Sequence, residues 1–199
     1  EMTSRDWSSD VCSSDLSIRM GRRRAFRGAA LILSAALCCA GCGTGKTAEA
    51  PPSAESVAES INRPFDVAAT IKMGGIEAEA DLNRTENGVC TFLFHQPAAL
   101  DGMTVTLDRD TIGLSYLGLS VEADSEKVLS SSVTKAIVAS INLAAEPSGV
   151  TVGVDGSAIL VSGKTDSGDF TLRLDQKNQS MLTLSIPSLD LECHFSSGK

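Results

Sequence analysis

The sequence has few of the residues that carry most enzyme chemistry. It contains only two histidines, His95 and His194, in 199 residues, and a metal site needs three or four converging ligands. No Gly-X-Ser-X-Gly motif is present, and the serines at residues 130–132 fall within a predicted helix with no base nearby in the sequence. We therefore predict no enzymatic activity, no metal site and no cofactor.

Long hydrophobic runs are also missing. The apolar run over residues 29–40 is too short for a membrane-spanning helix, which takes about 20 residues. It follows an arginine-rich start, MGRRRAFR, and this layout is typical of a secretory signal. We predict a signal peptide over residues 20–41.

The end of this run resembles a bacterial lipobox, in which small residues precede a cysteine that is lipidated and becomes the first residue after cleavage. Ala40, Gly41 and Cys42 match that pattern, while Cys39 occupies the place that usually holds Leu. The resemblance implies that an acylated Cys42 anchors the chain to the bacterial cell membrane and that the following domain is extracytoplasmic.

The segment DWSSDVCSSDL, residues 6–16, has a different origin. It is the unbroken translation of a common sequencing-adapter oligonucleotide, so we interpret residues 1–19 as an artefact and exclude them from fold reasoning. Trp7, the single tryptophan, and Cys12 are excluded with them.

The stretch AGCGTGKT, residues 40–47, fits the permissive phosphate-loop pattern. A phosphate loop must follow a buried strand and open a helix. Here it follows the predicted signal, and Pro51 and Pro52 stand where the helix would run. We predict that no nucleotide binds.

Positive charge is scarce after the predicted signal. Of 17 basic and 25 acidic residues, six basic and four acidic ones precede Cys42, which leaves a net charge of −10. This surface argues against binding of nucleic acid or of anionic lipid headgroups. The length suits one domain over residues 54–199, joined by a flexible polar tether over residues 42–53. We expect a monomer.

What the sequence does have is period-two alternation of apolar and polar residues. This pattern predicts antiparallel strands with one buried face, and it excludes an all-parallel sheet. Turn signals separate the runs, which gives a mainly β (α+β) meander of nine or ten strands. The alternating runs begin at Phe65, Ile76, Cys90, Met103, Phe170, Leu182 and Leu189, and the turn signals are Gly74-Gly75, Asn87-Gly88, Asp155-Gly156, TDSGD and DQKNQS.

Two helices are predicted beside the strands. A short one covers residues 54–62, and a longer one covers residues 125–145, capped by Asp124 or Ser125 and ended before Pro147. Ten strands would span about 48 Å if flat, whereas a twenty-residue helix is about 30 Å long. Because so few helices leave much apolar sheet uncovered, we predict that the sheet curls into an unclosed half-barrel with the helices as a lid.

Several inward positions hold alanine, which either lets a helix dock closely or leaves space for an apolar ligand. The candidate residues lining such a cavity are Val67, Ala69, Ala78, Ala80, Phe92, Phe94, Val105, Val133, Ile137, Leu172 and Leu184. Cys90 and Cys193 are the two cysteines left for the fold, and they are either a disulfide or two buried thiols.

The order of these features, with the segments FHQPAALDGMTV and FTLRLDQKNQSMLTLSIPSLDLECHF, resembles the bacterial lipoprotein-carrier superfamily, of the LolA/LppX-like kind. The resemblance implies a hydrophobic cavity that holds acyl chains. Unlike the soluble carriers, this chain has its own anchor and no clear inward arginine in the first strands, since Arg63 and Arg84 fall at strand ends. The alternative is an envelope interaction module whose barrel is filled by its own side chains.

Overall fold

The computed structural model describes residues 52–109, 111–128 and 132–198. The adapter-like segment, the signal peptide, Cys42 and almost all of the tether lie outside the described residues, so these predictions stay untested. The chain divides into the units Glu1–Lys46 and Thr47–Lys199, and every described helix and strand belongs to the second unit.

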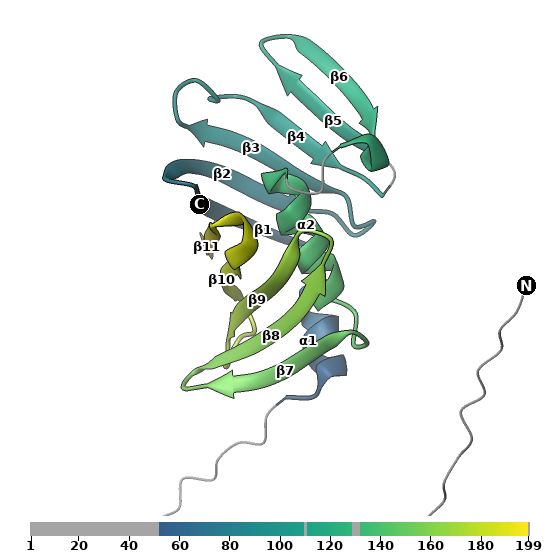
Figure 1. Cartoon of the computed structure of the whole chain (residues 1–199), viewed down its shortest axis with the longest axis vertical. Helices are drawn as coiled ribbons and strands as arrows, with labels where there is room; N and C mark the ends of the chain where they lie inside the picture. The colour runs from purple at the N-terminus through teal and green to yellow at the C-terminus, as the bar shows by residue number, and fades with distance from the viewer. Residues whose placement is uncertain (1–51, 110, 129–131, 199) are drawn as a thin grey trace, which may run out of the picture. The chain divides into compact units, whose positions relative to one another are not determined.

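The second unit is built on one open antiparallel sheet of eleven strands. In sheet order the strands run β6-β5-β4-β3-β2-β1-β11-β10-β9-β8-β7, so the first and last strands pair at the centre and β6 and β7 form the edges (Figure 1). Such a sheet is consistent with an unclosed half-barrel. The bounds are β1 Phe65–Met73, β2 Ile76–Arg84, β3 Cys90–Gln96, β4 Thr104–Leu107, β5 Thr111–Tyr116, β6 Leu119–Asp124, β7 Val150–Asp155, β8 Ala158–Thr165, β9 Gly168–Asp175, β10 Met181–Ile186 and β11 Leu191–Ser197.

The prediction of nine or ten strands was therefore too low. In the hairpin of β5 and β6, apolar side chains such as Leu119 and Val121 are exposed, so alternation there does not mark a buried face. Elsewhere the alternation is confirmed: in β2 the inward positions Ala78, Ala80 and Leu82 are buried between exposed carboxylates. All five predicted turn signals connect neighbouring antiparallel strands.

The N-terminal helix α1, Ala54–Ile61, agrees closely with its prediction, and the Ser53 side chain caps it by accepting from the Ser56 N–H at 3.2 Å. The longer helix was predicted to start too early. Asp124 caps only a 3₁₀ turn, η1 (Ser125–Lys127), and α2 runs over Val133–Ala144 with Ser132 at its N-cap. Short-range capping chemistry was present at Asp124, but it supports one turn and not the helix.

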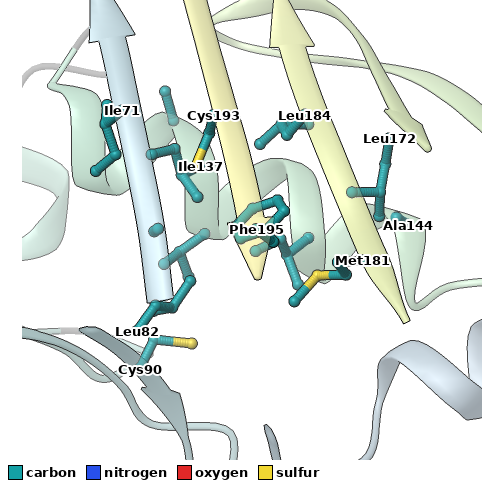
Figure 2. Close-up of a cluster of buried hydrophobic side chains, with 14 of the residues drawn as sticks. Ile71, Leu82, Cys90, Ile137, Ala144, Leu172, Met181, Leu184, Cys193 and Phe195 are labelled. Carbon is teal, nitrogen blue, oxygen red and sulfur yellow. The ribbon is translucent and has the colours of Figure 1, made fainter. Parts of the chain in front are cut away.

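Both helices pack on the same side of the sheet as the buried side chains. Helix α2 contacts β4, β8, β9 and α1, while α1 also contacts β7. Figure 2 shows Ile137 and Ala144 of α2 among side chains from the central strands, including Ile71, Leu172, Leu184 and Phe195. A second short 3₁₀ helix, η2 (Pro187–Leu189), joins β10 to β11. Within residues 52–109, 111–128 and 132–198, no helix has the length and apolar character needed to cross a membrane.

Candidate functional site

An apolar pocket of about 320 Å³ lies between the start of α2 and the strands β1 to β4. Its walls are Ile71 and Met73 of β1, Ile76 and Ala78 of β2, Phe94 of β3, Val105 of β4, Leu100 and Met103 of the loop between β3 and β4, and Val133 and Thr134 of α2. Among the described residues that line the pocket, Thr134 is the only one with a polar side chain. This volume is at the lower end of the range of about 300–1,000 Å³ for small-molecule sites.

The pocket exists because α2 covers only part of the sheet face. Helix α2 starts at Val133, and Leu100 and Met103 of the loop between β3 and β4 line the pocket together with that first turn. Ala78 leaves room there, since the other side chains that line the pocket are larger. Two methionines, Met73 and Met103, line the pocket, and their flexible side chains adapt to irregular apolar shapes.

Four of the eleven cavity-lining candidates lie in this pocket: Ala78, Phe94, Val105 and Val133. The other seven belong to the packed core or pack against it, away from the pocket: Val67, Ala69, Ala80, Phe92, Ile137, Leu172 and Leu184. Alternation identified the inward face correctly, but it carries no information about where along that face the helix lies. Ile71, Met73, Ile76 and Met103 stood on the same alternating runs and were missed for this reason.

Arg84 corrects the prediction that the first strands hold no inward arginine. It occupies the last inward position of β2 and is only 7% exposed, whereas Arg63 is exposed and pairs with Glu59 at 3.5 Å. The Arg84 Nη1 donates to Asn142 Oδ1 at 2.8 Å, and Nη2 donates to Asn62 Oδ1 at 3.2 Å. The Nε has no hydrogen-bond partner among the residues that the structure describes.

The environment of this buried guanidinium explains how its charge is tolerated. Across the part of the chain that the structure describes, no carboxylate forms an ion pair with it. Asn62 is the C-cap of α1, and Asn142 lies in the last turn of α2. The positive charge therefore lies at the C-terminal ends of two helices, whose dipoles are negative there. Arg84 ties both helices to the sheet.

Cys90 and Cys193 are free, buried thiols. They do not form the disulfide that the sequence left open, because the strand register keeps them apart. Cys90 of β3 is opposite Arg84, the last residue of β2. Cys193 of β11 is opposite Ile71 of β1, which is itself opposite Ala78 of β2. Ala78 and Arg84 are six residues apart, or about 20 Å along the strand. A disulfide needs Cα atoms roughly 4–7 Å apart. Figure 2 shows the two side chains at different places in the core.

Burial also makes both thiols unreactive. It raises the pKa of the Cys193 thiol to about 12 and raises that of Cys90 as well, although the nearby Arg84 charge lowers the Cys90 pKa in part. A thiol that keeps its proton near neutral pH is a poor nucleophile. Neither cysteine has the environment of a catalytic group.

Among the described residues, polar groups do not converge on the apolar pocket. His95 pairs with Asp81 at 2.8 Å and His194 with Glu192 at 3.2 Å, and all four side chains are exposed. Among the described residues, no cluster of three or more His, Cys, Asp or Glu side chains could hold a metal ion. A larger hollow of about 710 Å³ beside β6 is lined mainly by polar residues, including Arg109, Glu122 and Glu126.

The chain matches no protein-family model and no curated protein sequence. Solved structures to which it is similar include an uncharacterized conserved protein from Thermus thermophilus, with a TM-score of 0.44, 13% identity and coverage of 73% of this chain and 88% of that one. A LolA superfamily protein from Nitrosomonas europaea is similar with a TM-score of 0.41 and 11% identity, over 73% of this chain and 92% of that one. The Mycobacterium tuberculosis lipoprotein LppX is similar with a TM-score of 0.38 and 12% identity, over 69% of this chain and 88% of that one. At these values the likenesses assign no function.

Proposed function

We propose that this chain is a membrane-anchored, extracytoplasmic lipoprotein that binds a hydrophobic ligand, such as an acyl chain, in the pocket between α2 and strands β1 to β4. The observation that carries the proposal is the lining of that pocket, in which nine of the ten described side chains are apolar. Moving an aliphatic chain from water into such a site is favourable by about 0.8 kcal/mol for each buried CH₂.

The size of the pocket limits the ligand. With about 320 Å³ available, the site suits one aliphatic segment, and α2 with the loop between β3 and β4 acts as its cover. The protein works as a monomer in this proposal. No nucleic acid, nucleotide, metal or cofactor takes part.

A second candidate function is an envelope interaction module with a filled core. It is favoured by the seven predicted cavity residues that instead pack in or against the core, among them Phe92, Leu172 and Leu184. In that case the pocket is a packing defect with no physiological ligand, and the surface of the domain carries the function.

Native mass spectrometry distinguishes these two functions. The unit Thr47–Lys199 contains every described helix, every described strand and the whole core, so we expect it to fold by itself. Purified without detergent after export, it should carry or take up a lipid that is lost on denaturation. Ala78→Trp, which fills the pocket, should abolish uptake, whereas Ala68→Trp on the other face of β1 should not. An apo mass that takes up no added lipid would favour the packed module.

Anchoring is tested separately by cell fractionation. Wild-type chain should stay with membranes after a high-salt wash, because two acyl chains on Cys42 hold stably where one would be marginal. Cys42→Ala chain should be released to a much larger extent than the wild type. If the variant were retained as fully as the wild type, the anchor would lie elsewhere.

A further inference from the structure

Three hairpin tips lie at the same end of the strands β1 to β6. They are the turn Gly74-Gly75, the loop over residues 97–103 and the turn Leu117-Gly118. Figure 1 shows them along one side of this half of the sheet. Three large aliphatic side chains at these tips are strongly exposed: Ile76 (68%), Leu117 (83%) and Leu119 (73%). Together with Leu100 of the loop, we call these four residues the apolar rim.

The opposite end of the same strands has the reverse character. Its connections include Glu86 in the turn between β2 and β3, Asp108 and Arg109 after β4, and the charged 3₁₀ turn Ser125–Lys127 after β6. In the turns and loop at the apolar end, Asp101 is the only charged residue. The two ends therefore present different surfaces, and the apolar side chains are not spread evenly over the molecule.

Leu117 is also at odds with the local backbone. Both Leu117 and Gly118 have positive φ, at 49° and 79°, and two-residue hairpin turns of this kind favour Asn-Gly or Asp-Gly. A branched apolar side chain is disfavoured at positive φ, and at 83% exposure it gains little packing in return. Neither folding nor solubility explains a leucine here, and such local conflicts are expected at functional sites.

The rim is continuous with the mouth of the apolar pocket. Ile76 and Leu100 belong to both the rim and the pocket lining, and Val105 of the pocket pairs with Leu114 of β5 in the hairpin that ends at Leu117. A surface that covered the rim would therefore face the opening of the pocket.

We propose that the apolar rim inserts into an electrically neutral lipid bilayer, which places the mouth of the pocket against the acyl chains. Separate protruding tips suit a fluid bilayer better than a protein partner, which needs a broad complementary surface. The chain carries a net charge of −8, so attraction to anionic headgroups does not contribute. The inference rests on the proposed function for its anchor: twelve residues from Cys42 to Ser53 span up to about 40 Å.

Vesicle co-sedimentation of the unit Thr47–Lys199 tests the rim without the anchor. Wild-type protein should bind phosphatidylcholine vesicles, with little change between low and high salt. The double variant Leu117→Asn, Leu119→Thr should bind roughly a hundredfold more weakly, since burial of each leucine is worth about a factor of ten. Asn fits the positive φ of the turn, so folding should be kept.

Leu182→Thr is the matched control, because this exposed leucine (37%) lies on β10, outside the rim; it should bind vesicles like the wild type. The proposal is overturned if the wild type does not bind, if binding requires anionic lipid, or if the double variant binds equally well. A wild-type dimer that the double variant dissociates would assign the rim to a second copy instead.

Lipid uptake, measured on the same proteins, separates this inference from the proposed function. The rim variant should still take up lipid from detergent solution, whereas Ala78→Trp should lose uptake and keep vesicle binding. If the wild-type protein took up lipid but did not bind vesicles, the insertion of the rim would be refuted and the proposed function would stand.

Discussion

At the scale of single residues, Arg84 has the most unusual position in the described core. Its guanidinium is buried, and its two Nη atoms donate hydrogen bonds to asparagine side chains. The C-terminal ends of two helices, and not a carboxylate, lie next to its charge among the described residues. The two bonds connect β2 to α1 and α2, so one side chain holds both helices on the sheet. The exposed pair of Arg63 with Glu59 offers a natural comparison.

We expect Arg84→Met to lower the free energy of unfolding by about 1–3 kcal/mol, because Asn62 and Asn142 lose charged donors. Arg84→Lys should recover only part of this, since a lysine cannot reach both oxygens with a planar fork. Arg63→Met should cost no more than about 0.5 kcal/mol. Urea denaturation of the three variants measures the differences. Equal midpoints for Arg84→Met and Arg63→Met would refute the claim that Arg84 holds both helices on the sheet.

At the scale of elements, the pairing of β8 with β9 depends on a glycine. Gly163 is opposite Phe170, and a Cβ at this position would lie 2.8 Å from the Phe170 ring and 3.2 Å from Val150 Cγ1. The ring of Phe170, which is buried, therefore lies over the backbone of β8. Gly153, in the edge strand β7, has nothing within 4 Å of the same added atom.

Gly163→Ala should therefore destabilise the fold by about 1–3 kcal/mol, since the Phe170 ring must leave its place. Gly153→Ala should be neutral or stabilising by up to about 1 kcal/mol, because the unfolded chain loses conformational freedom. Thermal unfolding followed by circular dichroism compares the two variants. A Gly163→Ala protein as stable as the Gly153→Ala protein would contradict the packing of Phe170 against β8.

At the scale of the whole molecule, burial is uneven along the sheet. The strands β1, β2, β9 and β11 supply many fully or nearly buried side chains, whereas β5 and β6 at one edge supply none. The hairpin of β5 and β6 is linked to the loop between β3 and β4 by Tyr116, whose hydroxyl donates to the Ala99 carbonyl at 2.7 Å. Regions with few buried contacts open at lower cost than the core.

We expect the hairpin of β5 and β6 to open before global unfolding. Tyr116 is the only tyrosine, and the unit Thr47–Lys199 has no tryptophan, so tyrosine fluorescence reports on this hairpin alone. Its change should occur at lower urea concentration than the loss of far-ultraviolet circular dichroism, which reports the whole sheet. Coincident transitions would mean that the hairpin unfolds with the core.

Much of the fold could be predicted because alternation is a local property. The inward positions Ala78, Ala80 and Leu82 follow from the period of two, and the turn Gly74-Gly75 follows from the need for positive φ. The start of α2 could not be predicted, since Asp124 is a good cap whose helix ends after one turn. Capping chemistry reports on a few residues, whereas helix length depends on what packs against it.

The sequence by itself determined an antiparallel sheet with one apolar face, two helices and the order in which they come, because each follows from neighbouring residues and their spacing. Only the tertiary structure decided where α2 lies, and with it the pocket at Ala78 and Phe94, the burial of Arg84 and the separation of Cys90 from Cys193. These depend on strand register and helix docking, which bring together residues far apart in the chain. No local pattern encodes such distances.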